Sequence, residues 1–384
     1  MTKSVLSIVS TLARSGPMNV LKNLILHFDP LKYRSIIATL SPEPADSCIE
    51  EFGSLGVQVK QMKLSRAASF LSGARTLRHL ASEVKPDIVH THGFRADVLA
   101  ARAGLECPII STLHCNLFED YGFAYGDHVG ALLARRHFAT LKRFDAVIAV
   151  SESVADTALQ WGVAARVIQN GVDLGVYCPP LDLHHIQALR ASLGWPSEAV
   201  ILLHTGSLSS RKNPVKVVTD FCASGISRQG FLVFAGGGSL RTECEKAAGA
   251  ASNIVFLGKR KDVPDLLRAA DVLISASSSE GLPMALLEGC ASGIRVLATD
   301  IPPHKYIQRI FPVQMQIFDQ EKSESLQTAL EGLQPESLRR RFVPSPSTLE
   351  MISSHRMSIQ YQDSYAAVLQ LTSCATLEPE RTAL

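Results

Sequence analysis

The sequence lacks several features that would place it in a membrane, on nucleic acid or among disulfide-stabilised proteins. No run reaches the roughly 18 apolar residues that a membrane-spanning helix needs, and a net charge of +2 provides no strong attraction to nucleic acid. The eight cysteines are scattered without a C-x-x-C pair, which argues against disulfides or zinc and favours free thiols. Residues 1–9 show no signal-peptide cleavage pattern. We therefore expect a cytoplasmic protein for which any membrane contact is peripheral, on the inner face of the cell membrane.

The length and composition describe a globular protein with two domains. The chain has 384 residues, of which 46% are hydrophobic and 19% charged, enough for two complete cores. Strand-like apolar runs alternate with helical patterns, which is typical of parallel, doubly wound α/β sheets. Strands are predicted at residues 5–9, 33–40, 57–62, 88–93, 109–113, 146–151 and 167–173, and then at 199–205, 231–238, 254–260, 270–276 and 295–299.

Two prolines mark the boundary between the domains. Pro179 and Pro180 stand in a polar stretch, residues 177–185, that is typical of a linker. We therefore place the first domain at residues 1–176 and the second at residues 186–352.

A strand, a polar loop and a helix follow one another around residues 270–289. The apolar run 270–276 predicts a strand, and Pro283 suits the first position of a helix, where its missing N–H costs nothing. Free N–H groups at such a helix start favour an anion. Glu280 lies in the loop, whereas Glu288 lies in the helix, about 7.5 Å along its axis from Pro283. The two carboxylates are thus better placed to hold two parts of one ligand than to share a proton.

This spacing, with Gly281-Leu282-Pro283 inside it and the segment 293–300 after it, resembles the E-x7-E signature of retaining GT-B glycosyltransferases. The matching family is the large one, of the family 4 type, that includes bacterial surface polysaccharide and lipopolysaccharide enzymes. The resemblance implies two Rossmann-like domains facing across a cleft, with the acceptor in the first and a nucleotide-diphosphate sugar in the second. It also implies that the last helix, about residues 356–384, returns to the first domain. Glu280 would contact the donor sugar and Glu288 the ribose.

Glycine turns carry further parts of the resemblance. Gly16 follows the first strand, and it is either a plain turn glycine or a place where backbone approaches the donor diphosphate and the acceptor. Gly236 and Gly237 end a strand whose turn, in relatives, approaches the nucleotide, and Arg260 ends the next strand beside the base. Residues 170–173 are a further segment that matches the family, and the matching segments follow one another in the family's order along the chain.

The segment 206–214 departs from the family pattern. Relatives carry an Arg and a Lys here that grip the donor diphosphate. Lys212 matches the Lys, but Ser207 stands in place of the Arg, which removes about 1.5–3 kcal/mol of charge-assisted contact. Arg211, next to Lys212, is a candidate substitute for the missing arginine, although adjacent residues rarely reach the same point.

Three histidines lie at strand ends in the first half. His90 and His92 share a strand face, which permits a metal pair or, as we favour, one histidine in the crevice and one over the core. His114 ends the next strand, where ligands of open α/β sheets bind. It is either structural or, as the resemblance implies, a group beside the reacting sugar.

Three further segments have open interpretations. Residues 118–127 have no clear period and are interpreted as a mobile loop near the acceptor site or as a surface excursion. The segments 66–79 and 135–143 combine basic and apolar residues, which fits either an anionic membrane face or, as we favour, solvated helix faces. Residues 66–84 are predicted as one helix.

The resemblance therefore implies a retaining, metal-independent glycosyltransferase without a cofactor, whose donor is a UDP- or GDP-sugar and whose acceptor is a glycan or a lipid-linked glycan. Glu280, His114 and Lys212 are the predicted catalytic residues. The predicted donor-binding residues are Gly16, Ser207, Lys212, Gly236, Gly237, Arg260, Glu280, Gly281, Leu282 and Glu288. Alternatives are a degenerate homologue acting as a scaffold, which Ser207 motivates, or a GT-B epimerase or phosphorylase.

Overall fold

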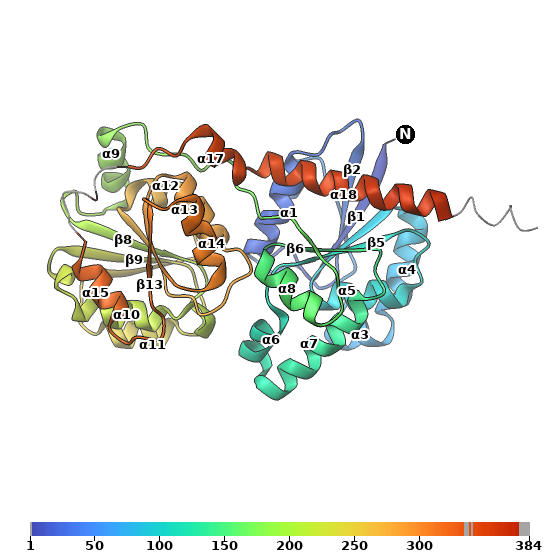
Figure 1. Ribbon diagram of the computed structural model, residues 1–384, viewed down its shortest axis with the longest axis horizontal. Helices are drawn as coiled ribbons and strands as arrows, with labels where there is room; N and C mark the ends of the chain where they lie inside the picture. The colour runs from blue at the N-terminus through green and yellow to red at the C-terminus, as the bar shows by residue number, and fades with distance from the viewer. Residues whose placement is uncertain (1, 334–337, 339–340, 376–384) are drawn as a thin grey trace, which may run out of the picture. The chain divides into compact units, whose positions relative to one another are not determined.

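The computed structural model describes residues 2–333, 338 and 341–375. The chain forms two compact units, the first made of Met1–Gly171 with the segment from Ser354 onward, and the second of Val172–Ser353. Each unit is a layered α/β structure in which every described strand pair within the sheet is parallel (Figure 1). Two parallel-sheet domains are the fold class that the sequence predicted.

The sheet of the first unit has the strand order β3-β2-β1-β4-β5-β6-β7. Its direction of growth reverses between β1 and β4, and ligands of open α/β sheets bind outside the strand ends at such a switch point. The strands are β1 (Lys3–Val9), β2 (Tyr33–Thr39), β3 (Gln58–Gln61), β4 (Ile88–His92), β5 (Ile109–Leu113), β6 (Ala146–Ala149) and β7 (Arg166–Val167). The helices of its first 171 residues are α1 (Gly16–Leu26), α2 (Ile49–Ser54), α3 (Arg66–Leu71), α4 (Gly73–Val84), α5 (Phe94–Ala103), α6 (Leu117–Tyr125), α7 (Asp127–Leu141) and α8 (Glu152–Gln160).

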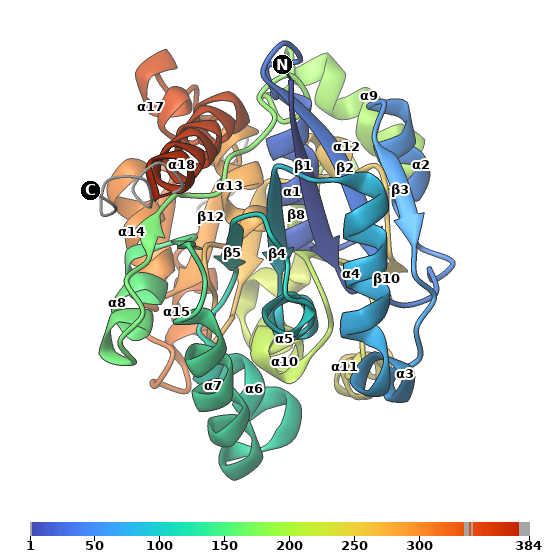
Figure 2. The ribbon, with the colours of Figure 1, turned by 90° about the vertical axis from the view of Figure 1, so that its right-hand side faces the viewer.

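The two faces of this sheet are covered by different helices. Leu6 and Ile8 of β1 pack in one cluster with Leu77 of α4 and Leu99 of α5. The opposite face is covered by α1 and by the last helix, α18 (Ser354–Ala375), which lies along α1 (red in Figure 1, also Figure 2).

Helix α18 belongs to the core of the first unit. Tyr361 and Tyr365 are fully buried, and the Ser358 hydroxyl donates to the Leu24 carbonyl at 2.8 Å. The predicted return of the last helix to the first domain is thereby confirmed, while residues 376–384 lie outside the described residues.

The sheet of the second unit has the strand order β10-β9-β8-β11-β12-β13, with its switch point between β8 and β11. Its strands are β8 (Val200–Thr205), β9 (Gly230–Ala235), β10 (Ile254–Gly258), β11 (Val272–Ser275), β12 (Arg295–Thr299) and β13 (Met315–Phe318). Its helices are α9 (Leu183–Leu193), α10 (Pro214–Ala223), α11 (Arg241–Ala248), α12 (Val263–Ala269), α13 (Met284–Ala291), α14 (Pro302–Ile310), α15 (Ser325–Glu331) and α17 (Pro346–Met351).

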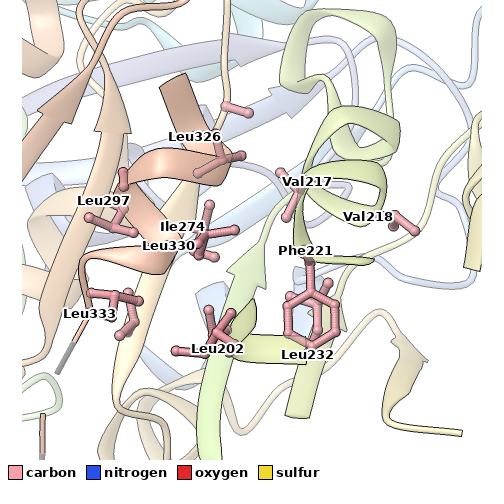
Figure 3. Close-up of a cluster of buried hydrophobic side chains, with 14 of the residues drawn as sticks. Leu202, Val217, Val218, Phe221, Leu232, Ile274, Leu297, Leu326, Leu330 and Leu333 are labelled. Carbon is pink, nitrogen blue, oxygen red and sulfur yellow. The ribbon is translucent and has the colours of Figure 1, made fainter. Parts of the chain in front are cut away.

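Apolar side chains from β8, β9, β11 and β12 meet those of α10 and α15 on one face of this sheet (Figure 3). Phe221 and Leu330 are completely buried there, and burying such a side chain contributes about 1.5–3 kcal/mol. On the other face α13 lies very close to β11, since a Cβ on Gly289 would be 2.5 Å from Leu273. This packing fixes the helix that carries Glu288.

The strand predicted at residues 167–173 is only the two-residue β7, and β13 was not predicted. Three further local predictions were wrong. The segment 118–127 is mainly helix α6, because the Asn116 side chain accepts the Phe118 N–H at 3.1 Å and caps the helix start. The single helix predicted for residues 66–84 is divided into α3 and α4, because the backbone of Ser72 between them is not helical (φ −126°, ψ −7°). Pro283 precedes α13 as its N-cap and is not its first residue, a shift of one position.

Candidate functional site

Two loops at the switch point of the second unit carry most of the predicted donor site. The loop after β8 contains a single 3₁₀ turn, Ser210–Lys212, and the loop after β11 contains Glu280. Because β8 and β11 are paired neighbours, their carboxyl ends place both loops at one edge of the sheet.

Glu280 is the centre of a cluster of three charges. Lys212 Nζ lies 2.5 Å from Oε1 of Glu280, and Arg211 Nη1 lies 2.8 Å from Oε2. The same Arg211 nitrogen donates to the Ser279 carbonyl at 2.8 Å. In return the Ser278 N–H donates to the Arg211 carbonyl at 2.9 Å. Main chain and side chains thus tie the two loops together.

The cluster keeps Glu280 ionised. Burial alone would raise its pKa, but the nearby Lys212 and Arg211 cations outweigh burial and lower the pKa to about 2. The carboxylate is 8% exposed, so a negative charge is held in a nearly closed site with a compensating excess of positive charge.

Although adjacent residues rarely reach one point, Arg211 and Lys212 both reach the Glu280 carboxylate. A carboxylate has two oxygens, and each cation takes a different one. Ser207, by contrast, is exposed on the same loop, and its hydroxyl lies 3.2 Å from that of Ser209. Arg211 therefore brings a second cation to the edge where the serine brings none.

Next to this cluster, at the same edge of the second sheet, the glycine turn after β9 packs directly against the backbone of the loop after β8. A Cβ on Gly236 would lie 1.7 Å from the Gly206 carbonyl oxygen, so only glycine fits there. The Gly237 carbonyl accepts from the Leu208 N–H at 3.1 Å. The predicted Gly236 and Gly237 are thus joined to the loop that carries Ser207 and Lys212.

Arg260 is not brought into this cluster. It follows β10, two strands from β8, and its guanidinium makes hydrogen bonds of 2.8 Å and 2.5 Å to Asp262.

The second glutamate of the motif lies on α13, as predicted. Glu288 is 5% exposed, and Leu282, in the preceding loop, is 4% exposed; Gly281 is also buried. Glu280 lies in the loop before α13 and Glu288 lies within the helix, so the two carboxylates occupy separate positions.

Two histidines near the cluster were missed by the sequence analysis. Burial lowers the pKa of both His204 and His304 to about 4, and both interact electrostatically with Lys212 and Glu280. His304 Nδ1 lies 2.9 Å from the Thr299 carbonyl, and the Thr299 hydroxyl donates to Ser277 at 2.5 Å. Through Thr299, these bonds hold Ser277 at the start of the loop that carries Glu280. No local pattern signals His304, because its role depends on the pairing of β12 with β11.

The edge of the first unit carries neutral histidines. His90 is buried between the Tyr365 hydroxyl and the Thr112 hydroxyl, each at 2.8 Å. His92 Nδ1 lies 3.0 Å from His114 Nε2. Burial lowers the pKa of His90 to about 3 and that of His114 to about 4, so both rings are neutral at pH 7.

The structure therefore separates the roles of the paired histidines. His90 belongs to the core beneath the edge, and His92 links it to the predicted site residue His114, with ring centroids of the two paired histidines 4.2 Å apart. Gly16, the other predicted residue of this unit, begins α1 after β1. Within the described residues, no group of three or more His, Cys, Asp or Glu side chains is arranged to hold a metal ion, and no helix is long and apolar enough to cross a membrane.

Family comparisons agree with this two-part architecture. Residues 15–176 match the family described as Glycosyltransferase Family 4, and residues 185–333 match the one described as Glycosyl transferases group 1. A Bacillus subtilis protein that bears the name of a glycosyltransferase, EpsF, is 27% identical over 311 residues, covering 78% of this chain and 79% of that protein.

A second relative and a solved structure extend the comparison. The Escherichia coli UDP-Gal:α-D-GlcNAc-diphosphoundecaprenol α-1,3-galactosyltransferase is 26% identical, covering 59% of this chain and 61% of the relative. The crystal structure of Anabaena HepE in complex with UDP and glucose superimposes with a TM-score of 0.77, covering 95% of this chain and all of that one, at 16% identity. This last likeness confirms the fold.

Proposed function

The chain belongs to the glycosyltransferases, with a family 4 domain followed by a group 1 domain, and from this we propose that it transfers a sugar from a nucleotide diphosphate to a lipid-linked glycan with retention of anomeric configuration. The acceptor proposal rests on the E. coli relative, whose name specifies a diphosphoundecaprenol-linked acceptor and a UDP-sugar. The UDP proposal is also supported by HepE, which was crystallised with UDP and glucose.

The convergence of Lys212 and Arg211 on Glu280 is the observation that carries the proposal. A diphosphate leaving group needs positive charge, and a sugar needs a carboxylate to orient its hydroxyls. Both are present at one switch point, with α13 beginning just after the loop. Arg211 supplies the second cation that Ser207 cannot, which weakens the alternative of a degenerate scaffold.

The proposed step breaks the bond between the anomeric carbon and the β-phosphate oxygen. Lys212, Arg211 and the first N–H groups of α13 stabilise the negative charge that develops on the diphosphate. The acceptor hydroxyl oxygen attacks the same face of the anomeric carbon, and its proton passes to the departing phosphate oxygen. Glu280 holds the sugar hydroxyls, Glu288 the ribose, and His114 the sugar from the first unit. We propose that this charge arrangement needs no metal.

The proposed acceptor also places the protein at a membrane surface. A glycan linked to a polyprenyl diphosphate stays in the bilayer, so we propose peripheral contact between this protein and the membrane.

A ligand-binding screen tests the donor site directly. The thermal shift of the protein is measured with UDP, GDP, ADP, CMP and their common sugars, for wild type, Glu288→Gln and the exposed control Glu243→Gln. We expect one nucleotide diphosphate to raise the melting temperature of wild type and the control, and to do so much less in Glu288→Gln. Product analysis by NMR then reports the anomeric configuration, and inversion would contradict retention. If no nucleotide or nucleotide sugar binds at millimolar concentration, the proposal fails.

A further inference from the structure

His92 and His114 lie side by side at the ends of two neighbouring strands of the first unit. β4 and β5 are parallel neighbours, with His92 opposite Thr112 (Figure 2), and His114 comes directly after β5. His92 Nδ1 lies 3.0 Å from His114 Nε2. The ring centroids are 5.3 Å apart and the ring planes are inclined by 29°, which fits two imidazoles joined nearly edge to edge. The hydrogen bond therefore fixes the orientation of the His114 ring as well as its position.

The two histidines of β4 differ in how their ring nitrogens are satisfied. Both nitrogens of His90 lie 2.8 Å from hydroxyls, those of Tyr365 and Thr112. His92 is 6% exposed, and its Nε2 is buried without a hydrogen-bond partner among the described residues. Within the same part of the chain, the bond to His114 is the one hydrogen bond that the His92 ring makes. A buried nitrogen without a partner destabilises the folded state, so folding alone does not explain a histidine at position 92.

The bond to His92 decides which part of His114 can meet a ligand. The Nε2 atom of His114 is occupied, whereas the ring is only half-buried and lies at the strand edge where ligands of open α/β sheets bind. Burial lowers the pKa of His114 to about 4, so the ring is neutral at pH 7 and its Nδ1 can make one hydrogen bond. Because a bond between two neutral imidazoles needs one donor and one acceptor, the proton position of His92 also sets the tautomer of His114.

We propose that His92 is a positioning residue for the transfer reaction, which holds His114 through its Nε2 atom so that the Nδ1 atom is presented to an oxygen of the donor sugar. His92 does not touch the sugar in this arrangement and acts through His114. A residue that lowers stability while it orients a site residue follows the general pattern in which functional positions depart from the rules of good folding. This inference rests on the proposed function, because it takes His114 as the sugar contact of the first unit.

Leucine at position 92 separates a positioning role from a structural one. His92→Leu removes the bond to His114 but also removes the unpartnered buried nitrogen, so we expect the melting temperature to stay within about 2 °C of wild type or to rise. The transfer rate should nevertheless fall about threefold to tenfold, as expected for one neutral hydrogen bond. The matched variant His92→Asn has the branched shape of leucine but keeps a polar atom at the position of Nδ1, so it should transfer at close to the wild-type rate.

A double-mutant cycle tests whether His92 acts through His114. If it does, His92→Leu should have no further effect on the transfer rate in the His114→Asn background, and the double variant should match the slower single variant. Nitrogen-15 NMR of protein labelled at histidine gives a readout that is independent of activity. The Nε2 resonance of His114 should shift in His92→Leu and stay in place in His128→Leu, which changes an exposed histidine of α7. The thermal shift by UDP, which reports the second unit, should be unchanged in all these variants.

The outcomes distinguish this inference from the proposed function. Full activity of His92→Leu, or rate losses that add in the double variant, overturn the inference alone, because wild type still transfers sugar and responds to UDP. A His92→Leu variant that melts well below wild type, with the same loss of rate in His92→Asn, assigns His92 a structural role and also overturns the inference. Absence of transfer and of any nucleotide response in wild type overturns the proposed function, and the inference fails with it because no reaction remains for His92 to serve.

Discussion

The two units place very different chemistry at the same position of the same kind of sheet. At the switch point of the second unit an ionised carboxylate is held between two cations. At the corresponding edge of the first unit, buried histidines are neutral and contact hydroxyls or one another. The buried carboxylate and its two cations suit the charged leaving group that we propose the second unit receives, whereas the histidines of the first unit offer neutral hydrogen-bonding groups suited to sugar hydroxyls.

Removing the central charge should give the largest effect. Glu280→Gln keeps the size of the side chain but leaves Arg211 and Lys212 without their carboxylate, and it removes the proposed sugar contact. We expect the transfer rate to fall by about 10²- to 10³-fold, measured as initial rates with the donor found in the screen. Glu243→Gln, an exposed glutamate of α11, is the matched control and should be active. Activity of Glu280→Gln close to that of wild type would remove the functional contrast between the two edges.

Removing Lys212 should lower the transfer rate more than removing Arg211. Lys212→Met should lower the rate by about 10²-fold and Arg211→Met by about tenfold, because a contact with a charged group contributes about 1.5–3 kcal/mol. The smaller effect is expected for Arg211 because its guanidinium is also engaged by the Ser279 carbonyl. The exposed Lys246→Met serves as control, with rates and UDP affinity measured together. If Arg211→Met keeps full activity and UDP affinity, Arg211 does not replace the arginine missing at Ser207.

The neutral edge should be visible in the pH dependence of stability. The folded protein holds His90 neutral down to a pKa of about 3, whereas the unfolded chain binds a proton near the ordinary value of 6.5. Below pH 6.5 the unfolded state therefore gains the proton first, and the stability that this histidine contributes is lost progressively as pH falls toward 3. His90→Gln should reduce the slope of unfolding free energy against pH, between pH 4.5 and 6.5, by up to about 1.4 kcal/mol per pH unit.

Urea unfolding at a series of pH values measures this slope, with the exposed His128→Gln as control. Glu280 acts in the same direction but in a lower window, because its pKa is lowered from 4.5 to about 2. An unchanged slope in His90→Gln would mean that the buried histidine takes up its proton in the folded state as readily as in the unfolded one.

The smallest effect is expected at His114. His114→Asn removes a neutral hydrogen-bonding group, which is worth about 0.5–1.5 kcal/mol, so the rate should fall about threefold to tenfold with little change in UDP affinity. His128→Asn is the control. A loss as large as that of Glu280→Gln would show that the first unit contributes more to the chemistry than its neutral edge suggests.

Most strands and the glutamate motif were predictable because their signals are local, whereas the four-residue β13 was missed. Apolar runs such as β1 and β4 are bounded by polar or glycine-containing turns, and the positions of Glu280 and Glu288 follow from one strand, one loop and one proline. Helix α6 was missed because its mixture of glycine, aromatic and acidic residues has no clear period, although Asn116 followed by Glu119 and Asp120 is a helix-start signal that could have found it.

The contacts across the edge were not predictable, because they join residues far apart in the chain. Arg211 and Glu280 are 69 positions apart, and their contact depends on β8 and β11 being neighbours. His304 supports the Glu280 loop only through the pairing of β12 with β11. A sequence pattern reports which residue types lie at a strand end, whereas the order of strands decides which of them meet.

The position of α18 has a consequence for biosynthesis. The hydroxyl of Tyr365 satisfies His90 at the centre of the first sheet, yet it is made only after the whole second unit, Val172–Ser353, has been translated. At a synthesis rate of about 5–20 residues per second this takes on the order of ten to forty seconds. During that interval the nascent first unit has an open apolar face beside α1, so the half of the protein that is made first is the half that is completed last.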